Sequence, residues 1–193
     1  MGGVEALQRL FGALPADIPA ALFVVQHIGR WSSQLPQILA PHSSLPVVQA
    51  VQRGVISPGT ICIAPPDHHL ILERGHTRLT RGPRENWARP AIDPLFRSAA
   101  RVYGRRVVGV ILTGLLNDGS AGLAAVRAAG GCAVVQDPAD AIAPDMPWNA
   151  LRHAGADYRV KLAEIPALLA RLSDELVLET ATTSSDWRWR AKS

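Results

Sequence analysis

Two kinds of apolar pattern alternate along the chain. Some apolar residues form continuous runs of strand length, typical of parallel strands covered on both faces, and others recur at helical spacing. The runs predict strands at 21–27, 45–51, 105–114, 132–137 and 158–160, and the helical spacing predicts helices at 4–13, 32–40, 92–103, 121–131, 147–156 and 162–176. Strands that alternate with helices in this way favour a doubly wound α/β fold, with a mostly parallel sheet and helices on both faces.

The middle of the chain follows a different pattern. Its apolar residues form short, partly alternating runs separated by turn residues, at 60–65, 68–74 and 77–82. Short runs with tight turns between them are typical of antiparallel strands. We therefore expect an antiparallel hairpin inserted in the otherwise parallel fold.

A length of 193 residues suits one compact domain. The pattern predicts a domain over residues 1–172, followed by a segment, 173–193, that holds the end of the last helix and a polar tail. A doubly wound domain is built from strand–helix units, yet the first predicted helix begins at residue 4 with no strand before it. We therefore expect the first strand of the sheet to be missing.

Composition narrows the class of protein. Hydrophobic residues make up 48% of the chain and charged residues 19%, so the chain can bury a core. No apolar run approaches the roughly 18 residues that span a bilayer, and the start has neither the basic nor the long apolar region of a signal peptide. Cys62 and Cys132 lie in apolar runs, where buried free thiols are expected. We expect a cytoplasmic protein without membrane insertion.

Charge and motifs argue against several ligands. The net charge is +4, and the densest basic stretch, Arg74 to Arg89, has no nucleic-acid motif beside it. This favours a solvated hairpin and loop over a site for phosphate or an acidic partner protein. Glycine-rich nucleotide motifs are absent from the sequence, and adjacent His68 and His69 would point to opposite faces of one strand, so they could not share a metal. We expect no cofactor, no metal and no nucleic acid.

Two polar residues stand where predicted strands end. His27 closes the first strand run, and Asp118 lies in the loop after the run at 105–114. Active sites of doubly wound sheets lie beyond the carboxyl ends of the strands, so these side chains could meet there. Asp118 could then bond Nδ1–H of His27 and orient a general base, as in a Ser-His-Asp hydrolase. Backbone N–H groups between Gly114 and Gly119 could line an oxyanion hole.

The same residues also have an ordinary structural interpretation. A strand-end histidine is more often a structural hydrogen-bonding group, and Asn-Asp-Gly is common in turns. The serines fit poorly as nucleophiles: Ser120 follows Asp118 too closely for both to meet one imidazole, and Ser32 and Ser33 are expected to cap a helix. The residues alone therefore leave open an esterase, a non-catalytic binding module and, less favoured without a phosphate loop, a nucleotide-binding α/β protein.

Five stretches carry a resemblance to a known family. They are GGVEALQRLFGALPADIPAALFVVQHI, PGTICIAPPDHHLILE, RPAIDPLFRSAARVYG, VVGVILTGLLNDGSAGLAAVRAAGG and VVQDPADAIAPDMPWNAL. Together they cover nearly everything from Gly2 to about Leu172. In order and length these segments resemble the catalytic domain of the chemotaxis protein-glutamate methylesterases, the CheB family.

The resemblance implies a function and site residues. The function is hydrolysis of glutamyl methyl esters on a chemoreceptor or another methylated signalling protein, with methanol released, and in some members deamidation of receptor glutamines. His27 and Asp118 match two members of the family's Ser-His-Asp triad, and Leu115, where the family usually has Met, matches the backbone donor to the oxyanion. The family serine lies in a turn whose last glycines match Gly2-Gly3, so it would lie upstream of Met1.

The resemblance therefore implies a stand-alone catalytic domain that is truncated at the N-terminus. The alternative is an inactive module that binds receptors or signalling partners.

Overall fold

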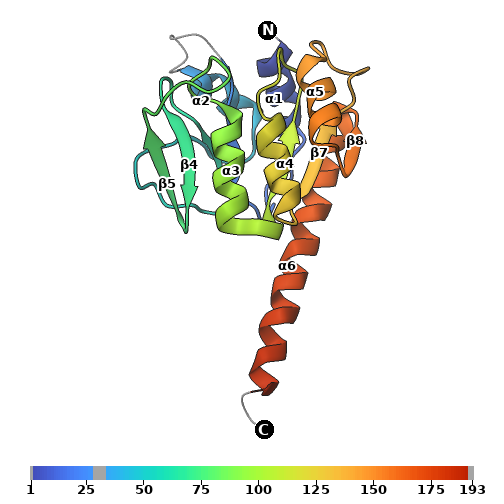
Figure 1. Cartoon of the computed structure of the whole chain (residues 1–193). Coiled ribbons are helices and arrows are strands. Elements are labelled where there is room, and N and C mark those ends of the chain that lie inside the picture. Colours follow the sequence, from blue (N-terminus) through green and yellow to red (C-terminus); the bar gives the residue numbers. More distant parts are fainter. Residues whose placement is uncertain (1, 28–33, 191–193) are drawn as a thin grey trace.

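The computed structural model describes residues 2–27 and 34–190, with side chains up to residue 178. Strands and helices alternate over most of these residues (Figure 1). The strands are β1 (Leu22–Val24), β2 (Val47–Gln49), β3 (Ile61–Ile63), β4 (His69–Glu73), β5 (His76–Thr80), β6 (Val108–Ile111), β7 (Cys132–Gln136) and β8 (Tyr158–Val160). The α-helices are α1 (Gly2–Gly12), α2 (Leu35–Leu39), α3 (Ile92–Tyr103), α4 (Ser120–Ala128), α5 (Asp145–His153) and α6 (Ile165–Arg190).

Six of these strands form two separate parallel sheets of three strands each. The strand orders are β1-β3-β2 and β6-β7-β8, so β1 and β6 are both edge strands. Neighbours on β7 point to opposite faces: Val134 belongs to the core cluster that contains α1 and α6, whereas Ala133 and Val135 belong to the cluster that contains α4 and α5. Helices cover both faces, which confirms the doubly wound α/β fold.

The antiparallel hairpin is confirmed, but it is shorter than the sequence pattern suggests. β4 and β5 pair antiparallel from His69↔Thr80 to Glu73↔His76. The expected antiparallel strand at 60–65 is wrong, because β3 lies between β1 and β2 and is parallel to both. Ile61 and Ile63 are 0% and 2% exposed, which is typical of the continuous apolar run of a covered parallel strand.

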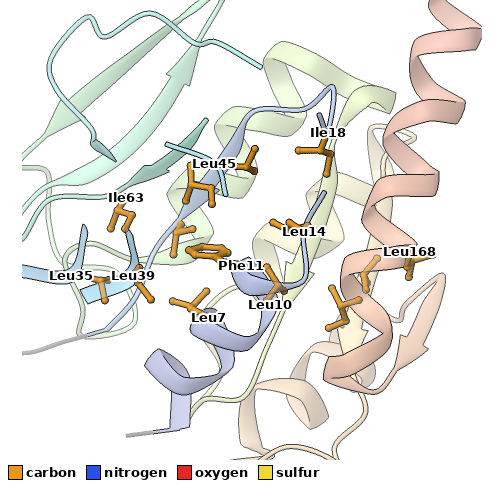
Figure 2. Packing of buried hydrophobic residues seen from close by; sticks show 14 of the residues in the cluster. Leu7, Leu10, Phe11, Leu14, Ile18, Leu35, Leu39, Leu45, Ile63 and Leu168 are labelled. Atoms are coloured by element: carbon orange, nitrogen blue, oxygen red, sulfur yellow. The ribbon is translucent and has the colours of Figure 1, made fainter. Parts of the chain in front are cut away.

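The larger core cluster lies between α1, α6 and the first sheet. Its apolar positions on α1 recur at helical spacing, so one face of the helix is buried against the strands. Figure 2 shows Phe11 at the centre, between leucines of α1 and α2. Leu168 brings α6 onto the same cluster. This packing fixes where the first turn of α1 lies relative to β1.

The last helix differs from its prediction. The sequence pattern ends it at residue 176, whereas α6 continues to Arg190 and projects away from the domain (Figure 1). Residues 177–190 contain no Gly or Pro, so nothing in the sequence stops the helix. No helix of the described residues is both long and apolar enough to cross a bilayer. The predicted caps Ser32 and Ser33 lie outside the described residues.

Candidate active site

A cavity of about 540 Å³ lies between the two parallel sheets. Val24 of the edge strand β1 lines it from one side and Val110 of the edge strand β6 from the other. His27, Leu115 and Gly3 also line it. The cavity therefore joins the carboxyl end of β1, the loop after β6 and the first turn of α1, where the sheet architecture places a site.

The first turn of α1 packs closely against the residue that precedes His27. A Cβ at Gly3 would lie 2.7 Å from Nε2 of Gln26, and a Cβ at Gly2 would lie 3.0 Å from Cβ of Ile142. A larger side chain at either position would have to displace the side chain of Gln26 or Ile142. Gly2, Gly3 and His27 line the same cavity, so the N-terminus of α1, whose free N–H groups favour negative charge, opens beside His27.

Asp118 and His27 meet beside this cavity. Oδ2 of Asp118 is 2.7 Å from Nε2 of His27, and the same oxygen accepts a hydrogen bond from the N–H of Ile92 at 2.6 Å. Oδ1 accepts three more, from the Asn86 amide at 2.7 Å, the Gly119 N–H at 2.9 Å and the Asp93 N–H at 3.2 Å. Asp118 is only 2% exposed, so α3 and α4 hold a buried carboxylate against the histidine.

Hydrogen bonds keep this carboxylate charged. Burial of Asp118 raises its pKa, but the bonds from His27, from the N–H of Ile92 and from Asn86 lower it by more in sum. The net pKa therefore lies below the ordinary value of 3.8, and Asp118 is an anion at neutral pH. A buried anion beside an imidazole stabilises the charged form of that ring.

The contact uses a different ring nitrogen from the one expected. The sequence argument placed Asp118 on Nδ1 of His27, whereas the structure places it on Nε2. Nε2 is the nitrogen farther from the backbone, and it reaches the carboxylate beneath the N-terminus of α3. Nδ1 has no hydrogen-bond partner among the described residues, so it is the nitrogen available to a reacting group.

The loop after β6 offers a backbone donor. Leu116 has φ 66°, a left-handed conformation that is uncommon for leucine, and the amide of Asn149 donates to its carbonyl at 2.7 Å. Gly114 is anchored by donating to the carbonyl of Ala143 at 2.9 Å. The N–H of Leu115 between them has no partner among the described residues. Leu115 itself is 67% exposed and lines the cavity, as an oxyanion donor would have to.

Two residues of the site were missed by the sequence argument. The sequence pattern places Asn86 in the solvated stretch from Arg74 to Arg89 and Asp93 at the start of the predicted helix at 92–103. In the structure the Asn86 amide nitrogen donates to Oδ2 of Asp93 at 2.8 Å as well as to Asp118. Asp93 is itself 5% exposed and accepts the N–H of Gly122 at 2.6 Å. No sequence signal marks Asn86, because only the fold brings its loop to Asp118.

Other candidates have structural roles. His69 is buried and its Nε2 is 2.8 Å from the carbonyl of Pro83, while half-buried His68 accepts a hydrogen bond from Arg81. No group of three His, Cys, Asp or Glu side chains among the described residues could hold a metal. Ser120 is buried, and its hydroxyl neither lines the cavity nor finds a hydrogen-bond partner in the described part of the chain.

The basic stretch is largely paired. Arg78 forms an ion pair with Glu73 at 2.9 Å, and Arg89 forms one with Asp67 at 2.6 Å. The first pair lies on the hairpin, and the second joins the turn before β4 to the loop after β5. Arginines neutralised in this way support the interpretation of the stretch as a solvated surface.

The chain has clear relatives. The sequence profile of the family described as CheB methylesterase matches residues 1–169. A relative from Leptospira interrogans is 37% identical over 173 residues, which cover 89% of this chain and 90% of that protein. A protein-glutamate methylesterase/protein-glutamine glutaminase of Anaeromyxobacter dehalogenans is 39% identical over 90% of this chain, but the chain spans about half of that relative's length (51%).

A solved structure agrees with the sequence relatives. The crystal structure of the Thermotoga maritima CheB methylesterase catalytic domain matches with a TM-score of 0.84 and 32% identity, over 89% of this chain and 93% of that one. Two parallel sheets, an antiparallel hairpin and a strand-end His–Asp pair define a doubly wound α/β domain of the kind on which hydrolases are built. The chain belongs to the CheB methylesterase family.

Proposed function

We propose that this protein hydrolyses glutamyl methyl esters of proteins, and that it can deamidate protein glutamines at the same site. The relatives' names give both activities, and both reactions are acyl transfers from a glutamyl side chain. The observation that carries the proposal is the 2.7 Å contact between His27 and the buried anion Asp118 beside the cavity. The substrate we propose is a methylated chemoreceptor or another methylated signalling protein.

In this mechanism His27 moves the proton. Its Nδ1 accepts the proton of a serine hydroxyl as the oxygen attacks the ester carbonyl, and Asp118 stabilises the resulting imidazolium. The N–H of Leu115 donates to the oxyanion of the tetrahedral intermediate. The imidazolium then protonates the leaving methoxide, giving methanol, and a water activated by His27 hydrolyses the acyl-enzyme in the same way.

We propose that the serine is carried on an extended segment ahead of α1. Three observations support this position: Gly2 and Gly3 line the cavity, the N-terminus of α1 opens beside His27, and β1 and β6 both end their sheets at the cavity. A strand between β1 and β6 would pair with both edges and lead directly into α1. The described residues that line the cavity include no serine or cysteine.

That last observation favours a second candidate, a binding module without hydrolytic activity. In such a module the His27–Asp118 pair would serve only to hold the end of β1 against α3 and α4. The two candidates differ in whether methanol is released and in whether His27 matters for that release.

The test uses the protein purified from its native source. Intact mass shows whether it exceeds the 20.7 kDa of residues 1–193, and release of methanol from a methyl-esterified glutamyl protein measures activity. We expect methanol to be released. His27→Ala should abolish this release, whereas His42→Ala, which changes an exposed histidine, should leave it intact. A mass equal to residues 1–193 with no methanol release would reject the hydrolase and leave the binding module as the remaining candidate.

A further inference from the structure

Two buried carboxylates share one hydrogen-bond donor at the site. Asp93 is 5% exposed and Asp118 is 2% exposed, and the amide nitrogen of Asn86 lies 2.8 Å from an oxygen of the first and 2.7 Å from an oxygen of the second. Two buried acids this close repel when both are ionised, so one of them would ordinarily keep a proton. The Asn86 amide opposes this protonation, because it donates a hydrogen bond to each carboxylate.

An asparagine amide is well matched to this position. Its NH₂ group has two hydrogens and no charge, so it can donate one hydrogen to each carboxylate without adding a further ionisable group. A buried aspartate of the same size would add a third acid and offer no donor. The residue type therefore fits the task of holding two anions side by side.

The backbone delivers this amide in a fixed orientation. Glu85 and Ala88 exchange backbone hydrogen bonds of 3.1 and 2.9 Å, which close a two-residue turn around Asn86 and Trp87. These residues have φ 49° and 63°, the left-handed pair of a type I′ turn, in which asparagine is favoured at the first position. Trp87 is 89% exposed, so the turn directs one side chain inward and the other into solvent.

The ends of the loop are tied as well. Buried His69 contacts both of them, through Nε2 to the carbonyl of Pro83 at 2.8 Å and through Nδ1 from the N–H of Ala91 at 3.3 Å. The ion pair of Glu85 with Arg97, at 2.6 Å, fastens the turn to α3. A donor preorganised in this way costs little further ordering when it binds the two acids.

We propose that Asn86 is a positioning residue, which bridges Asp93 and Asp118 so that Asp118 stays ionised and aimed at Nε2 of His27. This inference rests on the proposed function for its importance to catalysis, but the bridge itself does not depend on ester hydrolysis. The titratable groups that face the bridge are His27 at the end of β1 and Asp93 on α3, together with Glu85, which Arg97 neutralises.

The experiment measures the titration of the side-chain carboxyl groups of Asp93 and Asp118 by ¹³C NMR in the chain of residues 1–193. The central variant is Asn86→Gly, because glycine keeps the left-handed turn and removes only the amide. We expect one acid of the pair to take up its proton at a pH at least one unit higher than in the wild type. Asn86→Asp should shift the titration in the same direction, since it replaces both donors by another acid.

Two controls separate bridging from a general effect on the loop. Trp87→Gly changes the other central residue of the same turn, whose side chain is exposed, and should leave both carboxyl titrations in place. Asp93→Asn removes the second anion, and in that background Asn86→Gly should shift the Asp118 titration by less than it does when Asp93 is present. A folded Asn86→Gly protein with unchanged titrations would overturn the bridge, and so would a shift that is as large without Asp93 as with it.

Catalysis is measured separately on the protein from its native source. There Asn86→Gly should lower kcat by about 10- to 100-fold with little change in KM, because a misplaced base slows the chemical step more than binding. A titration shift in a protein that never releases methanol would retain the bridge and reject the proposed function. An unchanged kcat in an active enzyme whose titration does shift would remove the bridge's role in catalysis.

Discussion

At the scale of single residues, Asp118 determines what the site can do. Among the described residues, every hydrogen-bond partner of its two oxygens is an N–H donor or the imidazole of His27. An asparagine at this position would present an NH₂ group to at least one of those donors, which leaves a buried N–H such as that of Ile92 without an acceptor. An unsatisfied buried donor costs about 1–3 kcal/mol, whereas the comparable substitution in a serine protease triad lowers kcat about 10⁴-fold.

Asp118→Asn should therefore flatten the dependence of stability on pH. The folded-state pKa of Asp118 lies below the ordinary value of 3.8, so its charge stabilises the fold at neutral pH, and that stabilisation is lost as pH falls below about 4 toward the folded-state pKa. Urea unfolding between pH 6 and pH 3 should show a smaller loss of unfolding free energy in the variant than in the wild type. If both proteins lost the same unfolding free energy, the hydrogen bonds to Asp118 would not be stabilising its ionised form.

At the scale of elements, α3 and α4 cross closely because Gly122 has no side chain. A Cβ at Gly122 would lie 2.6 Å from Cβ of Phe96 and 3.1 Å from Cα of Asp93. Such contacts with a Cβ and with backbone cannot be relieved by turning a flexible side chain. The same glycine donates its N–H to Asp93. A change in the helix crossing would therefore also move Asp93, which shares the Asn86 donor with Asp118.

Gly122→Ala is consequently expected to separate α3 from α4. Overpacking of this kind costs about 1–3 kcal/mol, which outweighs the gain of up to about 1 kcal/mol that alanine brings to a helix interior. Chemical unfolding measures the difference. Ala121→Ser, at the exposed neighbouring position, is the matched control and should change the unfolding free energy by less than about 0.5 kcal/mol. A Gly122→Ala protein as stable as the wild type would show that the crossing is not tight.

Most helices and strands could be predicted from the sequence, but the pairing of the strands and the contacts between distant segments could not. α3 was expected over 92–103 and has those bounds, because its buried positions recur at helical spacing. β3 was assigned to the wrong kind of sheet, since neighbouring prolines resemble hairpin turns and only the tertiary fold reveals that it lies between β1 and β2. His27 and Asp118 were found because both follow strong strand runs. Asn86 does not follow a strand run, and its role depends on the tertiary fold, which places its loop against the start of α3.

At the scale of the whole molecule, only the start of α6 buries apolar side chains in the core. Ile165, Leu168 and Leu172 are buried, whereas Val177 and Leu178 are 46% and 68% exposed. The start of the helix thus belongs to the core, and its distal part projects away from the domain (Figure 1). A domain over residues 1–172, followed by the end of the last helix and a polar tail, therefore stays a prediction, which truncation can test.

Truncation after residue 178 should leave the thermal stability of the domain almost unchanged. Leu168→Ala should instead cost about 2–5 kcal/mol, because it opens a cavity beneath the helix. Differential scanning calorimetry of the two variants makes the comparison. If the truncated protein melts as low as Leu168→Ala does, the distal part of α6 packs against something, and the domain boundary lies further along the chain than 172.

His27 is synthesised well before Asp118, because the two residues lie far apart along the chain. The two residues are 91 positions apart, and at a synthesis rate of about 5–20 residues per second roughly 5–20 s separate their appearance on the ribosome. During that interval the histidine has no carboxylate to orient it, whatever part of the first sheet has already formed. On the proposed mechanism, a nascent chain that lacks Asp118 cannot hydrolyse an ester, and neither can a fragment cut between the two sheets.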